Sequence, residues 1–97
     1  MPSAPDLDAL RAEALAAVDR YAAAAFEDEP FVPGESSVSV AGKVIGAPEL
    51  RTLVDAALDG WLTEGRFADE FRGRLAGITE RPNVALVGSG SQANLLA

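Results

Sequence analysis

The sequence Ala-Pro-Glu-Leu-Arg-Thr-Leu-Val-Asp-Ala-Ala-Leu-Asp-Gly-Trp, residues 47–61, carries the strongest periodicity in this 97-residue chain. Its apolar positions recur every three or four residues, at Leu50, Leu53, Val54, Ala57, Leu58 and Trp61. This spacing places them on one side of an α-helix. Pro48 suits the first turn of that helix, and Gly60 suits its end. The stretch therefore predicts an amphipathic helix that ends with Trp61 in a core or an interface.

Helical spacing also appears on both sides of this stretch. Towards the C-terminus it involves Phe67, Phe71, Leu75 and Ile78. Towards the N-terminus, an alanine-rich segment repeats apolar side chains at Leu7, Leu10, Ala14, Val18, Tyr21 and Ala25. Asp6 or Ser3 can cap the start of this first helix. Because alanine buries little area, we expect the first helix to need a partner surface.

The segment between the first two helices predicts a loop. Glu27-Asp28-Glu29 and then Pro30 end the first helix, since proline disfavours helical geometry in the residue before it. These carboxylates are interpreted as a solvated face. Residues 38–40 alternate like a short strand. Lys43 is the one lysine and lies between glycines, where a solvated surface lysine is the expected reading.

The C-terminal residues predict a strand, a turn and the start of another helix. Residues 84–87 are a short apolar run, and Gly88-Ser89-Gly90-Ser91 follows it. Free backbone N–H groups at a helix start bind anions, so the turn is a candidate phosphate site. The same turn also fits an ordinary serine cap. Its G-x-G-x-x-A spacing matches part of a dinucleotide-binding fingerprint, whose acidic residue is expected beyond residue 97.

Composition excludes several classes of function. The net charge is −7, which disfavours binding to nucleic acid and to anionic membranes. No apolar run approaches the roughly 18 residues of a membrane span, and the start does not resemble a signal peptide, so we expect a cytoplasmic protein. The chain has no Cys and no His, so we predict neither a metal site nor catalytic residues.

Three separated motifs resemble one enzyme family. They are AGKVIGAPEL at residues 41–50, LDGWLTEGRF at residues 58–67 and SGSQANLLA at residues 89–97. Together they are similar to the pyridoxal phosphate-dependent sugar aminotransferase and dehydrase family of the DegT/StrS type. Within it, they most resemble the CDP-4-keto-6-deoxyglucose 3-dehydrases of lipopolysaccharide and dideoxysugar biosynthesis.

This resemblance implies that Gly90, Ser91 and Gln92 cradle the phosphate of pyridoxal or pyridoxamine phosphate. It also implies a nucleotide-sugar substrate and a homodimer for the full-length enzyme. The catalytic His of the dehydrases, and the 2Fe-2S cluster of some members, are expected outside this chain. We therefore do not expect the chain alone to bind the cofactor tightly.

The resemblance further implies an α/β fold. We expect the N-terminal part of a fold-type-I, aspartate aminotransferase-like protein, mostly helical here with one or two short strands. Residues 1–30 are predicted to be a helical extension, residues 31–46 a loop, and residues 47–97 the truncated start of the large domain. The predicted function is that of an N-terminal fragment of a sugar 3-dehydrase or aminotransferase, inactive alone. The alternatives are a small acidic helical interaction module and a truncated dinucleotide-binding domain.

Overall fold

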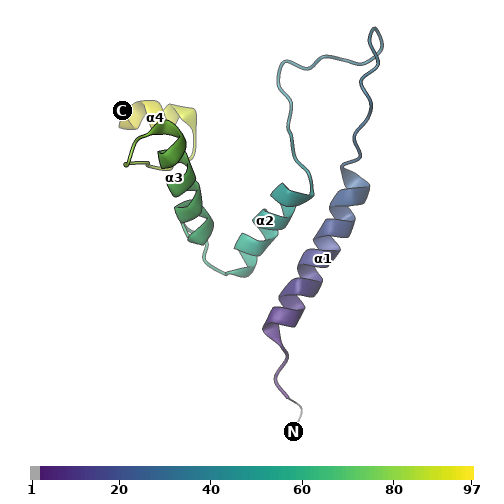
Figure 1. The fold of residues 1–97 in the computed structure, drawn as a ribbon, viewed down its shortest axis with the longest axis vertical. Coiled ribbons are helices and arrows are strands. Elements are labelled where there is room, and N and C mark those ends of the chain that lie inside the picture. Colours follow the sequence, from purple (N-terminus) through teal and green to yellow (C-terminus); the bar gives the residue numbers. More distant parts are fainter. Residues whose placement is uncertain (1–2) are drawn as a thin grey trace. The chain divides into compact units, whose positions relative to one another are not determined.

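The computed structural model describes residues 3–97 and contains four helices within them. These are α1 (Leu7–Ala25), α2 (Ala47–Leu58), α3 (Arg66–Thr79) and α4 (Gly90–Leu96), drawn in Figure 1. The chain divides into two units, Met1–Gly60 and Trp61–Ala97. The first unit holds α1 and α2, and the second holds α3 and α4.

The expected α/β fold is wrong for this chain, because residues 3–97 contain helices and no strand. Residues 38–40 and residues 84–87, where strands were predicted, have no regular secondary structure. A strand needs the backbone groups of a neighbouring strand as hydrogen-bond partners. Neither apolar run finds such a neighbour among the described residues, so neither becomes part of a sheet.

The helix ends follow local chemistry. The Asp6 carboxylate accepts hydrogen bonds from the backbone N–H groups of Asp8 and Ala9, at 3.0 and 3.2 Å, and so caps α1 as predicted. At the start of α2, the Glu49 carboxylate accepts from the backbone N–H of Gly46 at 2.8 Å. Gly60 follows α2 with a φ of +68°, a left-handed conformation that glycine adopts without a steric penalty.

The contact between α1 and α2 forms the core of the first unit. It buries Leu15 and Ala22, which are 5% and 1% exposed and are the two fully buried residues of the described chain. Arg51 of α2 pairs with Asp19 of α1 at 2.6 Å, while Arg11, earlier in α1, pairs with residues later in α2. The two helices are therefore antiparallel, and they lie side by side in Figure 1.

The apolar side of α1 that the sequence predicted is largely not the one that packs on α2. Leu7, Leu10 and Tyr21 belong to the predicted stripe, yet they are 74%, 49% and 65% exposed. The packed side is centred on Leu15 and Ala22, roughly a quarter of a turn further round the helix. Because α1 is rich in alanine, it has an inner apolar face against α2 and an outer one without a partner in the structure.

Arg11 links α1 to the last turn of α2. Its guanidinium pairs with the Asp55 carboxylate and donates to the Asp55 backbone carbonyl at 3.1 Å. A second guanidinium nitrogen lies 3.1 Å from the Asp59 carboxylate. All three side chains are partly buried, which reduces the solvent screening of their attraction. Arg11 therefore fixes the relative positions of the two helices at this end.

The second unit has no fully buried side chain. Phe67 and Leu75 of α3 are half-buried, whereas Phe71 and Ile78 of the same predicted stripe are exposed. The α3 helix ends at Glu80, which adopts a left-handed conformation with φ of 55°. The segment of residues 82–87 then partly covers α3 and half-buries Val84 and Leu86.

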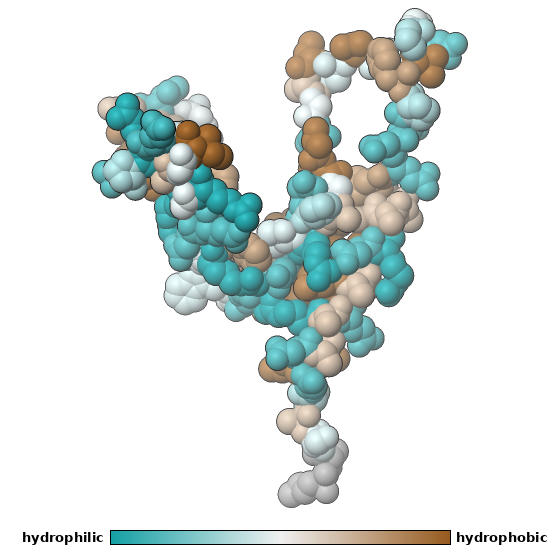
Figure 2. Space-filling model, in the orientation of Figure 1, coloured by the Kyte–Doolittle hydropathy of each residue, from teal (hydrophilic) through white to brown (hydrophobic). Residues whose placement is uncertain are grey.

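The two units together expose more surface than two compact proteins of the same total mass. Their accessible surface is 8524 Å². Two separate compact proteins, each with half the mass of this chain, would together expose about 6,300 Å² by the usual scaling of surface area with mass. Figure 2 shows hydrophobic side chains exposed on the loop between α1 and α2. Those of this loop are Phe26, Phe31, Val32, Val38, Val40, Val44 and Ile45.

Leu15→Ala is expected to lower the free energy of unfolding by about 2 kcal/mol, because it opens a cavity in the contact between α1 and α2. Leu53→Ala is the matched control. Leu53 lies in the same unit and is 66% exposed, so its loss is expected to change stability by less than about 0.5 kcal/mol. Urea unfolding followed by far-UV circular dichroism measures both. Equal effects of the two substitutions would show that this contact does not support the fold.

Arg11→Met is expected to destabilise the first unit by about 1 kcal/mol, because Asp55 and Asp59 lose a shared, partly buried cation. Arg74→Met removes an exposed pair with Glu70 within α3 and is expected to cost only about 0.3–0.5 kcal/mol. Urea unfolding at low and high salt tests this ranking. An Arg74 variant as destabilised as the Arg11 variant contradicts it.

Candidate functional site

The predicted phosphate turn forms the start of α4. Ser89 is the N-cap residue, and its hydroxyl accepts a hydrogen bond from the backbone N–H of Gln92 at 3.2 Å. The Gln92 side-chain oxygen accepts from the backbone N–H of Gly88 at 2.7 Å. These two hydrogen bonds fix the turn from both sides. The sequence prediction that a helix begins here is confirmed, and Ser89 acts as its cap.

Two of the three predicted site residues keep donors available for an anion. The backbone N–H groups of Gly90 and Ser91 belong to the first turn, where a helix supplies no acceptor. Among residues 3–97, no hydrogen bond is formed by these groups or by the Ser91 hydroxyl. The third residue, Gln92, uses both its backbone N–H and its side-chain oxygen to hold the turn.

Gly90 leaves open space beside these donors. A Cβ atom placed on Gly90 meets no atom within 4 Å. The backbone of Gly90 does not have a positive φ, so the local conformation does not itself require glycine. The absence of a side chain at Gly90 therefore matters for the room that an anion has to approach the backbone. The turn has the donors and the space for a phosphate group.

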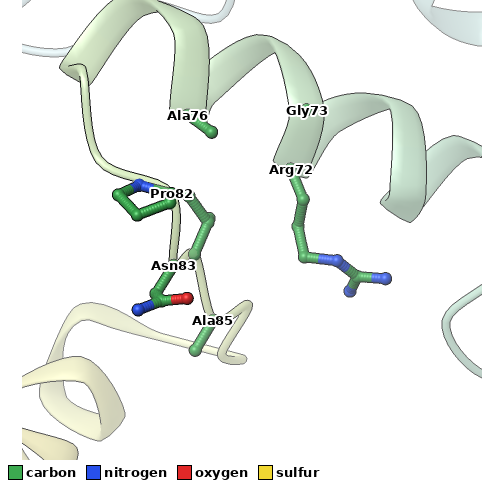
Figure 3. A pocket seen from close by; sticks show the side chains of 7 residues that line it. Arg72, Gly73, Ala76, Pro82, Asn83 and Ala85 are labelled. Carbon is green, nitrogen blue, oxygen red and sulfur yellow. The ribbon is translucent and has the colours of Figure 1, made fainter.

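The second unit has an open groove that no sequence motif predicted, between α3 and the segment that follows it (Figure 3). Its volume is about 490 Å³. The groove is lined by Arg72, Gly73, Ala76, Pro82, Asn83, Val84 and Ala85. Only the charge of Arg72, between Phe71 and Leu75 of the predicted stripe, could have pointed to it from the sequence.

The charge of Arg72 in this groove is already compensated. Its guanidinium donates to the Glu64 carboxylate at 2.7 Å and also pairs with Asp69. The hydrogen bond that Arg72 donates to Glu64, with a smaller contribution from Asp69, raises the pKa of Arg72 above its ordinary value. Arg72 is thus a permanent cation held by two carboxylates. It stabilises the start of α3 and is a poor candidate for attracting an anion or transferring a proton.

The other residues singled out in the sequence are exposed. Lys43 lies in the loop before α2, and the carboxylates of residues 27–29 lie on the surface, which confirms the interpretation of both as solvated. Trp61 is not a core residue, because its side chain is 66% exposed. The other half of that prediction, a place in an interface, stays a prediction. The indole N–H of Trp61 donates to the Glu64 carbonyl oxygen at 2.9 Å, so local hydrogen bonding holds the ring outside a core.

Residues 3–97 contain no group of three or more carboxylates that could hold a metal ion. The sequence offers neither an imidazole nor a thiol. Within residues 3–97 no helix is both long enough and apolar enough to cross a bilayer. The candidate binding groups of this segment are the free hydrogen-bond donors of Gly90 and Ser91.

Comparison with known proteins gives one informative similarity. The chain is 50% identical over 88 residues to the lipopolysaccharide biosynthesis protein RfbH of Salmonella typhimurium strain LT2. The match covers 91% of this chain and 20% of RfbH, so the chain spans about a fifth of the length of that relative. No model of a protein family matches the chain. No solved structure matches it. The predicted similarity to a protein of lipopolysaccharide biosynthesis is confirmed.

Ser89→Ala is expected to destabilise α4 by about 1 kcal/mol, because it removes the side chain that caps Gln92. Ser91→Ala is the matched control and is expected to leave α4 intact, since the Ser91 hydroxyl makes no hydrogen bond within residues 3–97. Backbone chemical shifts of residues 90–96 report the helix content of both variants. Loss of α4 in the Ser91 variant would give that hydroxyl a structural role instead of a free one.

Proposed function

We propose that this chain is a segment of an enzyme that modifies a nucleotide-linked sugar for lipopolysaccharide. The observation that carries the proposal is the 50% identity to RfbH over nearly the whole chain. The three motifs that resemble the sugar aminotransferase and dehydrase family support the finer assignment to a 3-dehydrase or aminotransferase. The substrate class in this proposal is a CDP-4-keto-6-deoxy sugar.

The role of the chain in such an enzyme is to bind and to position. Gly90 and Ser91 offer two backbone N–H groups and a hydroxyl to the cofactor phosphate. Hydrogen bonds to a charged group contribute about 1.5–3 kcal/mol each, so this set can hold a phosphate dianion when the remainder of the cofactor is bound elsewhere. The residues that would move protons are not in this chain, in keeping with its lack of His and Cys.

The open space at Gly90 and the free donors beside it fit the phosphate of pyridoxamine phosphate. When bound, this cofactor supplies an electron-accepting ring for removal of the sugar 3-hydroxyl. The groups that face that ring belong, in this proposal, to the remainder of the enzyme. A 2Fe-2S cluster and the contacts of a homodimer are assigned there as well. We therefore expect no turnover from the 97-residue chain alone.

An acidic helical interaction module is the second candidate function. It is favoured by the outer face of α1, which presents Leu7, Leu10 and Tyr21 to solvent. The third candidate, a dinucleotide-binding domain, requires a strand directly before the glycine-rich turn. Residues 84–87 form no strand, so the structure offers nothing in its favour.

A chimaera tests the proposed function. The 88-residue region of RfbH that this chain matches is replaced by the chain, and the product is expressed in a Salmonella strain that lacks RfbH. We expect the lipopolysaccharide banding pattern to return to that of the wild-type strain. In the purified chimaera, Ser91→Ala is expected to raise the Kd for pyridoxamine phosphate at least about tenfold, and Gly90→Val to raise it more.

Ser37→Ala is the matched control for the loss of a hydroxyl, because Ser37 is exposed in the loop between α1 and α2. Its Kd is expected to equal that of the parent chimaera. A folded chimaera that leaves the banding pattern of the deletion strain unchanged contradicts the sugar-modifying role. Unchanged cofactor affinity in both the Ser91 and Gly90 variants contradicts the phosphate site alone.

A further inference from the structure

The outer face of α1 has a recess in it. Leu7, Leu10, Arg11 and Ala14 of α1, together with Leu58 of α2, line a hollow of about 270 Å³. Four of these five side chains are apolar, and the three leucines are substantially exposed. Pockets that enclose small molecules are typically about 300–1,000 Å³, so this recess suits inserted side chains better than a cofactor.

The surroundings of the recess are negatively charged. The whole net charge of −7 lies in the first unit, which has eleven acidic and four basic side chains, whereas the second unit has four of each. Asp6 and Glu13 lie four residues before and three residues after Leu10, so they are its neighbours on the helix surface. Arg11, the cation that lines the recess, is paired with Asp55 and Asp59. The remaining cation of α1, Arg20, lies beyond Ala14 at the far end of the helix.

From these observations we propose that the outer face of α1 is a docking site for an amphipathic helix with Lys or Arg residues beside leucine-like anchors. The anchors enter the recess between Leu10 and Leu58, and the basic residues face Asp6 and Glu13. A helix laid in an apolar groove presents such anchors at three- and four-residue intervals. This proposal rests on the second candidate function, the interaction module, and names its partner; it does not depend on the sugar-modifying role.

The negative charge of the first unit also disfavours binding of a second copy of the chain to this face. Two first units brought together on this face would each contribute their seven negative charges. Like charges placed opposite one another at an interface disfavour association by several kcal/mol. A basic partner gains from the same charges, through faster encounter and complementary contacts. The outer face of α1 therefore suits a partner with a net positive charge.

A defined peptide tests the proposal with the intact chain. The probe is a fluorescently labelled amphipathic helix of Leu and Lys, with the leucines at helical spacing. One comparison peptide has Glu in place of every Lys, and another has the Leu–Lys composition in an order without an apolar face. We expect saturable binding of the first peptide by fluorescence anisotropy, weaker binding at high salt, and at least about tenfold weaker binding of both others.

Matched variants locate the binding on the chain. Leu7→Ala combined with Leu10→Ala is expected to weaken binding at least about tenfold, whereas Leu53→Ala, on the exposed side of α2, leaves it within about twofold. Glu13→Lys is expected to weaken binding severalfold more than Glu35→Lys, which changes the net charge equally but lies in the loop. Circular dichroism confirms that each variant keeps the parent's helix content.

Several results would overturn the proposal. They are the absence of saturable binding, equal binding of the Glu or reordered peptide, and equal effects of the Leu7 and Leu10 double substitution and the Leu53 substitution. Sedimentation provides a further check on the occupant. A dimer of the chain that the Leu7 and Leu10 substitutions dissociate would assign this face to a second copy instead.

Discussion

The antiparallel contact of α1 with α2 is the interaction on which the first unit depends. Leu15 and Ala22 are buried there, with Arg11 bound to two carboxylates at one end of the contact. Alanine lets two helices approach closely, but each alanine removes little apolar area from water. The contact can therefore align α1 and α2, yet it leaves the outer side of α1 and the long loop exposed. These exposed apolar surfaces are the physical reason to expect a partner.

The helices were predictable because their signals are local. The cap at Asp6, the proline at the start of α2 and the glycine after it each act within a few residues of the helix end. The packed side of α1 was not predictable in the same way. An alanine-rich helix is apolar on more than one side, and only the position of α2 selects Leu15 in place of Leu10.

The strand prediction was wrong for a related reason. The α/β fold depended on those strands, so that prediction was wrong too. Residues 84–87 have the composition of a buried strand, but a strand forms only against another strand. The turn that follows them was predicted more successfully, because the Ser89 cap is satisfied by its own neighbour, Gln92. The free donors at Gly90 and Ser91 follow from the same local geometry. Whether a phosphate uses them depends on groups that lie far from the turn, and the sequence pattern does not contain that information.

The contact between α1 and α2 is the main source of tertiary stability among the described residues. Native-state amide hydrogen exchange tests it most directly, because protection reports the local free energy of opening. We expect the slowest exchange in α1 between Leu15 and Ala22 and in α2 around Val54, with α3 and α4 exchanging much faster. Protection of the α3 amides near Phe67 and Leu75 equal to that at Leu15 would contradict it.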